Sequence, residues 1–242
     1  MRLIIWILMA VPMMAAGVVT YFWVKKRQKD NFHILPKCMT TWIVVCTAAA
    51  GLWSGAEAFE MLAAMILFLA ADALLEVKFY WGMVAFGAGH LILLAWLVSQ
   101  GPLHPASIVI WAVCMAGTLI LFRGEIRENR ENPVIYGMFL YPALLLVMVS
   151  VAVMLPVQAG KQYTLAAVGA VLFGISDMMV GKGFFISRGK MESPSEISEL
   201  SCNAGKGQCR ENWMLKYYGQ LSYAALSLYY AGIFCLALMT WM

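Results

Sequence analysis

The sequence predicts an all-α membrane protein with eight transmembrane helices. The chain of 242 residues is 62% hydrophobic and only 12% charged, a balance typical of membrane proteins that cross the bilayer several times and not of soluble domains. Its mean hydropathy of +0.77 agrees with that composition. In addition, Lys and Arg gather in alternate loops between the apolar runs, as expected of a protein with many membrane crossings.

Each predicted span is an apolar run that is long enough, or nearly so, to cross a hydrocarbon core about 30 Å thick. The first run is not a signal peptide, because it is too long and its basic cluster follows it instead of preceding it. The second and fifth runs are the shortest. The eight runs cover residues 3–24, 38–54, 57–76, 79–99, 105–122, 134–156, 163–185 and 217–241.

We interpret residues 1–242 as a single polytopic membrane domain with one long polar insert at about 186–216. The insert is rich in Ser, Glu, Gly and Lys, which is typical of a disordered connection or a mobile lid. The charged stretch 123–132 is expected to be a solvated loop.

The loop charges predict the orientation of the chain. The loops after the first, third, fifth and seventh spans, with their flanking residues, hold 15 of the 17 Lys and Arg residues, and only Arg2 and Lys161 lie elsewhere. The positive-inside rule therefore places these odd-numbered loops in the cytoplasm and both termini outside. In a bacterium this would be the inner, or plasma, membrane.

Two predicted spans each contain an aspartate, Asp72 in the third and Asp177 in the seventh. A carboxylate at the centre of a membrane helix costs about 2.5–3.5 kcal/mol, so such residues normally face protein or water and have a function. Ala170, Gly174 and Gly181 share the helical face of Asp177, which should let a neighbouring helix approach closely beside the acid.

The two aspartate segments also resemble each other. Residues 67–72 (LFLAAD) and 172–177 (LFGISD) share Leu, Phe and Asp at matching positions, with an offset of 105 residues. An even number of crossings separates the two spans, so they should run in the same direction. These features indicate a parallel four-plus-four repeat, although a chance match between apolar sequences is the alternative.

Other polar residues are expected at the same depth as the aspartates, in the cytoplasmic half of the membrane. Each also has a structural interpretation: lysine and tyrosine side chains often lie at the membrane interface, and histidine or glutamine can hydrogen-bond two helices. Together with Asp72 and Asp177 as catalytic candidates, the candidate substrate-binding residues are Lys37, His90, Tyr136, Tyr217, Tyr218 and Gln220.

The histidines argue against a metal site. The predicted topology places His33 in the cytoplasm, His104 outside and only His90 within the membrane, so three histidines cannot meet at one ion. We therefore expect acid–base chemistry without a metal or other cofactor.

Several motifs, in order along the chain, resemble those of the YhhN-like integral membrane proteins, which include the lysoplasmalogenases. A Tyr is often found in that family where this chain has Leu93, and the 186–216 insert is longer than expected. The matching motifs are Pro36-Lys37 with Thr40-Thr41, the Asp72 segment, Gly82-x3-Phe86-x3-His90, the segment 169–177 that ends at Asp177, and Tyr217-Tyr218-x-Gln220-Leu221.

This resemblance implies hydrolysis of the vinyl ether bond of a lysoplasmalogen, releasing a fatty aldehyde and a glycerophospho-alcohol. Such a bond opens by protonation at carbon, and water then captures the resulting oxocarbenium ion. A carboxyl group in an apolar setting can hold the required proton, while a second, ionised carboxylate stabilises the cation and activates water. Asp72 and Asp177 could divide these roles, with Lys37 and the tyrosines holding the phosphate.

The expected partner is thus a membrane lysophospholipid, and no nucleic acid is expected. Two alternatives remain from the sequence: a proton-coupled carrier of a small amphiphile, and a lipid-binding membrane protein without catalytic activity. A carrier would be expected to have broken helices, yet the prolines well inside the predicted spans, Pro12 and Pro142, lie in neither aspartate span.

Overall fold

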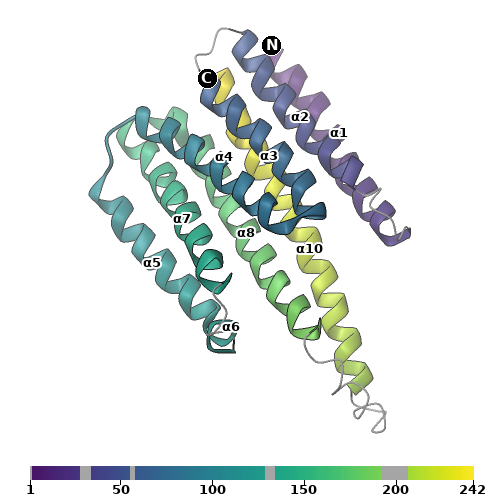
Figure 1. Ribbon diagram of the computed structural model, residues 1–242. Helices are drawn as coiled ribbons and strands as arrows, with labels where there is room; N and C mark the ends of the chain where they lie inside the picture. Colours follow the sequence, from purple (N-terminus) through teal and green to yellow (C-terminus); the bar gives the residue numbers. More distant parts are fainter. Residues whose placement is uncertain (1, 28–33, 55–57, 129–133, 192–206) are drawn as a thin grey trace.

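A computed structural model describes residues 2–27, 34–54, 58–128, 134–191 and 207–242. Within these ranges, side chains are described except at 79–80, 125, 128, 134–138, 183–191 and 207–221. Eight long α-helices in this part of the chain match the eight apolar runs of the sequence (Figure 1). They are α1 (Arg2–Arg27), α2 (Ile34–Trp53), α3 (Phe59–Val77), α4 (Phe79–Ser99), α5 (Pro105–Leu121), α7 (Val134–Gln158), α8 (Thr164–Met191) and α10 (Gly207–Leu238).

Six of these helices, as far as the chain is described, contain a stretch long and apolar enough to cross a membrane: α1, α2, α4, α7, α8 and α10. The protein is therefore a multi-pass membrane protein by length and composition. The helix α5 is apolar but only 17 residues long, and α3 carries Glu60, Asp72 and Glu76 within 19 residues. For α3 and α5, crossing of the membrane stays a prediction.

Two boundaries differ from the sequence-based expectation. The helices on both sides of the predicted 186–216 insert extend into it, because α8 continues to Met191 and α10 begins at Gly207; residues 192–206 lie outside the described ranges. The expected loop at 123–132 begins with the short helix α6 (Arg123–Glu128). In both places the prediction ended the helix where polar residues begin, but a helix satisfies its own backbone hydrogen bonds and can continue into water.

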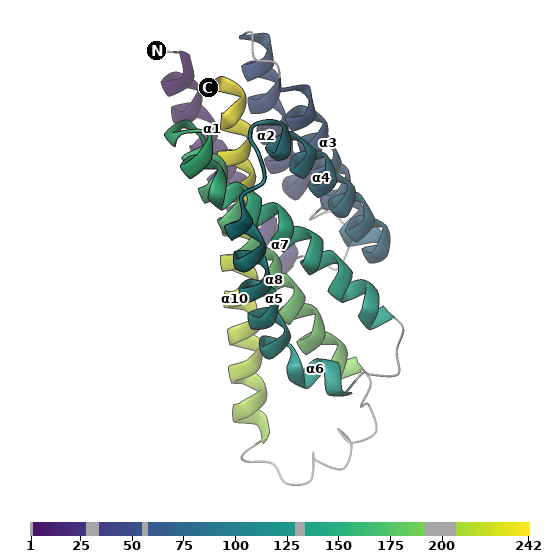
Figure 2. The same ribbon diagram turned by 90° about the vertical axis from the view of Figure 1, so that its left-hand side faces the viewer.

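The helices alternate in direction, so the two termini lie at the same end of the bundle (Figures 1 and 2). The end of α1 that carries its basic residues lies away from the termini, as does α6. The helices α3 and α8 run the same way (Figure 1), as a parallel repeat requires; the repeat itself and the cytoplasmic position of the charged end stay predictions.

The helix α8 packs closely against α10 near the centre of the fold. A Cβ atom added to Gly169 would lie 2.8 Å from the carbonyl oxygen of Gly232, and one added to Gly232 would lie 2.8 Å from that of Gly169. Only glycine allows two backbones to approach this closely. Beside this crossing, the rings of Phe68 from α3 and Phe173 from α8 lie 5.4 Å apart, so the matching phenylalanines of the two aspartate segments meet in the core.

Candidate active site

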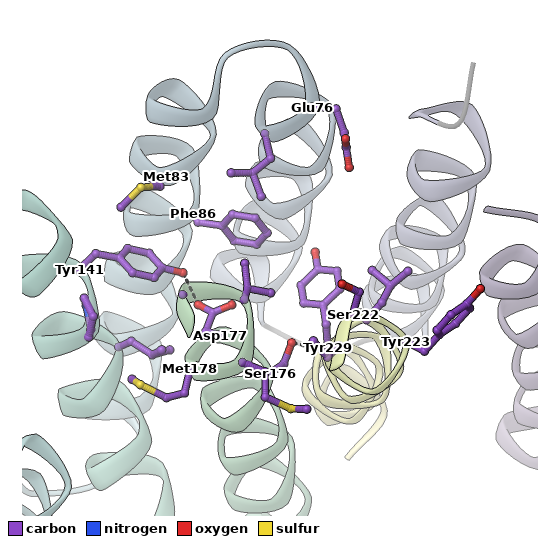
Figure 3. Close-up of a pocket in the computed structure, with 18 of the residues that line it drawn as sticks. Glu76, Met83, Phe86, Tyr141, Ser176, Asp177, Met178, Ser222, Tyr223 and Tyr229 are labelled. Atoms are coloured by element: carbon purple, nitrogen blue, oxygen red, sulfur yellow. Dashed lines mark hydrogen bonds between the residues drawn. The ribbon is translucent and has the colours of Figure 1, made fainter. Parts of the chain in front are cut away.

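A cavity of ≈ 510 Å³ lies between the helices in the half of the bundle that contains the basic end of α1. Its wall is largely apolar, with side chains such as Leu75, Met83 and Phe86 (Figure 3). Its polar lining comes from six helices and consists mainly of Tyr21, Lys25, Lys26, Glu76, Thr118, Tyr141, Ser176, Asp177, Ser222, Tyr223 and Tyr229. This size and character suit a ligand with an apolar chain and few polar groups.

Asp177 faces this cavity from α8 and is only partly buried. The hydroxyl of Tyr141 on α7 donates a short hydrogen bond to its Oδ2 atom, drawn as a dashed line in Figure 3. Among the described residues, its Oδ1 atom has no hydrogen-bond partner. The small-residue face is used as expected: a Cβ atom at Gly174 would lie 3.1 Å from Val149 of α7, so α7 comes close enough to place Tyr141 beside the acid.

Asp72 has a very different environment on α3. Its side chain is buried, and it is not among the described residues that line the cavity. Its Oδ2 atom accepts hydrogen bonds from Thr41 on α2 and from Tyr229 on α10, the latter at 2.8 Å. Its Oδ1 atom lies 3.5 Å from the ammonium of Lys37. Both oxygens are therefore engaged, one of them by a positive charge.

Lys37 lies between two carboxylates that are one helical turn apart on α3. Its Nζ atom is 3.2 Å from Glu76 Oε1 in addition to its contact with Asp72, and the side chain is only 8% exposed. Tyr230 donates to its backbone carbonyl at 2.9 Å, which ties α10 to α2 at this point. Burial of a lysine requires such paired charges. A role for Lys37 in phosphate binding stays a prediction.

Tyr229 joins the two aspartate sites. Its hydroxyl is bonded to Asp72, while its side chain lines the same cavity as Asp177. Asp72 thus reaches the cavity through a tyrosine hydroxyl, whereas Asp177 borders it directly.

His90 is fully buried in α4 between aromatic rings, beside the ring of Tyr141 but outside the described cavity lining. Its Nδ1 atom is bonded to the carbonyl of Phe86 at 2.6 Å, and its Nε2 atom has no hydrogen-bond partner among the described residues. The nearest rings among the described residues are those of Phe173 at 4.8 Å and Phe68 at 5.3 Å, followed by Tyr141 at 5.7 Å. A substrate-binding role for His90 stays a prediction.

The remaining predicted binding residues lie on helices whose side chains are not described at those positions. Tyr136 is in the first turn of α7. Tyr217, Tyr218 and Gln220 lie well inside α10, which begins ten residues before the predicted span. Their part in the site stays a prediction.

Sequence reasoning missed Tyr141, Tyr229 and Glu76. A tyrosine deep in an apolar run can be taken for a core aromatic, yet its hydroxyl needs a partner when buried. That requirement was the available signal for Tyr141 and Tyr229. The signal for Glu76 was its spacing of four residues from Asp72, which places both acids on one helical face.

Fold and site together define a helical, multi-pass membrane protein with a mostly apolar internal cavity bordered by a carboxyl group. The chain belongs to the YhhN family, whose family model matches residues 32–200. The matched range contains Lys37, Asp72, His90 and Asp177 but not α1 or α10. No curated protein and no solved structure matched the chain.

Proposed function

We propose that the protein is a hydrolase of the lysoplasmalogenase type, an activity present in the YhhN family. The observation that carries the proposal is the placement of Asp177, an acid with one tyrosine partner, on the wall of a largely apolar cavity. A single-chain lipid suits this cavity chemically. Its alkenyl chain is apolar, like the cavity wall, and its vinyl ether bond needs only a proton donor and water.

Asp177 is the proposed proton donor. A carboxyl group on an apolar wall is more easily kept protonated than one in water. With Oδ2 held by Tyr141, the Oδ1 atom is left to direct a proton into the cavity. Lys37 forms an ion pair with Asp72. Asp177 has no such ion pair among the described residues.

Asp72 is the proposed ionised partner. Hydrogen bonds from Thr41 and Tyr229 and the ammonium of Lys37 all favour the charged form of a carboxyl group. Its negative charge stabilises a cation in the cavity across Tyr229, whose hydroxyl can also orient water. Asp72 acts in this scheme through Tyr229 and not by direct contact with the lipid.

The reaction then has three steps with balanced protons. Asp177 transfers its proton to the vinyl carbon distal to the ether oxygen, which leaves an oxocarbenium ion and the Asp177 carboxylate. Water adds to the cationic carbon and returns one proton to Asp177, which gives a hemiacetal. The hemiacetal releases the glycerophospho-alcohol by moving its hydroxyl proton to the leaving oxygen, and the fatty aldehyde remains. Asp177 ends the cycle protonated.

The helices that carry the aspartates support an enzyme over a carrier. Both α3 and α8 are continuous α-helices through Asp72 and Asp177, whereas the substrate sites of many carriers are built from broken helices. The prolines inside long helices are Pro12 in α1 and Pro142 and Pro156 in α7.

The test is hydrolysis of a lysoplasmalogen by the purified protein, followed by the release of fatty aldehyde. The matched substrate is the alkyl ether lysophospholipid of equal chain length, which lacks the vinyl double bond and should give no aldehyde. The matched protein is Asp177→Asn. Aldehyde release that is equal in Asp177→Asn and the unaltered protein would contradict the proposal, as would an absence of release by folded protein.

A further inference from the structure

One part of the cavity wall is cationic, and its two lysines are not in the family motifs. Lys25 and Lys26, at the end of α1, both line the cavity, and α1 precedes the matched residues 32–200. They are the lysines and arginines that border the cavity in the described part of the chain.

The side chain of Lys25 is held against this wall. Its Nζ atom donates to the hydroxyl of Tyr21 at 2.8 Å and lies 5.1 Å from the centre of the Tyr21 ring. Tyr21 is itself buried and donates to Glu76 Oε1 at 3.2 Å. A buried tyrosine fixed by a carboxylate thus orients the ammonium, which remains solvent-accessible at the cavity.

The other candidate cation, Lys37, is already paired. Its ammonium lies 3.2 Å from Glu76 and 3.5 Å from Asp72, and the residue is buried away from the described cavity lining. An anion that bound Lys37 would have to displace two carboxylates and would meet their repulsion. In the described part of the chain neither Lys25 nor Lys26 forms a salt bridge, so an anion there displaces no carboxylate; Glu76 is separated from Lys25 by the Tyr21 hydroxyl to which both are bonded.

We propose that Lys25 and Lys26 form the binding site for the phosphate group of a single-chain phospholipid whose hydrocarbon chain occupies the cavity. The inference rests on the proposed function in taking the ligand to be a lysolipid. The phosphate oxygens accept hydrogen bonds from the two ammonium groups, which are charge-assisted and so stronger than neutral ones. The lipid chain then extends past Phe86 and Leu145 toward the apolar wall.

Basic residues at a helix end also set membrane orientation, so the test needs a control of equal charge. Arg27 supplies it: it lies on the same last turn of α1, but its guanidinium is 4.3 Å from the centre of the Trp23 ring and the residue does not line the cavity. Lys25→Gln, Lys26→Gln and Arg27→Gln each remove one charge from the same turn. Lys25→Arg restores the charge.

The experiment measures binding to purified protein in nanodiscs, with an alkyl ether lysophospholipid that cannot be hydrolysed at a vinyl ether. The matched ligand is the alkylglycerol of equal chain length, which has no phosphate. We expect Lys25→Gln and Lys26→Gln each to weaken lysophospholipid binding roughly five- to tenfold and the double variant more. Binding of the alkylglycerol should change less than about twofold, and Arg27→Gln should behave as the unaltered protein with both ligands.

Four outcomes would overturn the inference. One is equal weakening for the ligands with and without phosphate. Another is an effect of Arg27→Gln as large as that of Lys25→Gln, and a third is loss of binding in Lys25→Arg. The fourth is inorganic phosphate competing as strongly as the lysolipid, which would indicate a site for free phosphate. Since the assay needs no hydrolysis, lysine-dependent binding without aldehyde release would remove the proposed function and keep this site.

Discussion

The two aspartates occupy matching positions in their helices but unlike surroundings. Asp72 is enclosed by Thr41, Tyr229 and the ammonium of Lys37. Asp177 has one partner, Tyr141, and borders the cavity. Although their sequence segments are similar, Asp72 has a counter-ion and Asp177 faces a largely apolar cavity.

The different surroundings suit one aspartate to be ionised and the other to be protonated, and two aspartates in identical surroundings could not divide these roles. A carboxylate with a cation and two hydroxyl donors is stabilised in its charged form, whereas one on an apolar wall can keep a proton. The pattern agrees with the general rule that paired titratable groups in different environments divide acid and base functions. In the proposed reaction Asp177 contacts the substrate, and Asp72 gives electrostatic support.

The largest expected effect is on turnover in the aspartate variants. Asp177→Asn and Asp72→Asn should each lower kcat by about 10²–10⁴-fold, since Asn cannot donate a catalytic proton or carry charge. The double variant should be little worse than the poorer single variant, because groups that act as a unit are strongly non-additive. Near-normal turnover of either folded single variant would show that its aspartate is structural.

The same variants should differ in stability. Asp72→Asn leaves the buried Lys37 with Glu76 as its remaining carboxylate, so we expect a loss of about 1–3 kcal/mol in the free energy of unfolding, less than for a fully unpaired buried charge. Asp177→Asn should change it by less than about 1 kcal/mol. Thermal unfolding in one detergent would measure both. Equal destabilisation by the two substitutions would contradict the described difference between the sites.

Lys37→Met distinguishes the two proposed roles of that lysine. As the counter-ion of Asp72, Lys37 should affect kcat and stability, with KM nearly unchanged. As a phosphate ligand, it should chiefly raise KM. We expect the first result, with kcat reduced by about 10-fold or more. A rise in KM with unchanged kcat would return Lys37 to the phosphate site predicted from the sequence.

The tyrosine hydroxyls should have smaller effects that follow the same division. Tyr229→Phe removes one donor to Asp72, so it should lower stability by about 1 kcal/mol. Tyr141→Phe removes the only described donor to Asp177, so its main effect should be on kcat, with little change in stability. Steady-state kinetics and thermal unfolding of both variants provide the check. A reversed pattern would mean that the environments of the two carboxylates have been misassigned.

The smallest effect is expected at His90, which packs beside the ring of Tyr141. Its Nε2 atom is buried without a hydrogen-bond partner among the described residues, which is a cost of about 1–3 kcal/mol to the folded state. His90→Met replaces the imidazole by an apolar side chain of similar size and should leave stability unchanged within about 1 kcal/mol. Loss of substrate affinity in a stable His90→Met variant would instead support the binding role predicted from the sequence.

The sequence was informative where a residue conflicts with its surroundings. Asp72 and Asp177 were evident because carboxylates are costly in apolar helices, and the helices themselves follow from the apolar runs. The cavity wall was not evident, because Tyr141 and Tyr229 look like ordinary apolar-segment aromatics until the fold brings them to the acids. The partners of Lys37 were hidden for the same reason: Glu76 lies 39 residues away along the chain.

Labelling with a hydrophobic carbodiimide tests the division of roles most directly. Such reagents react with protonated carboxyl groups in apolar settings and spare ionised ones. We predict that the reagent modifies Asp177, that activity is lost in parallel, and that the alkyl ether lysophospholipid protects both; Asp72 and Glu76, which are paired with Lys37, should remain unmodified. Mass spectrometry of the labelled peptides gives the sites. Modification of Asp72 with Asp177 left intact would contradict the account.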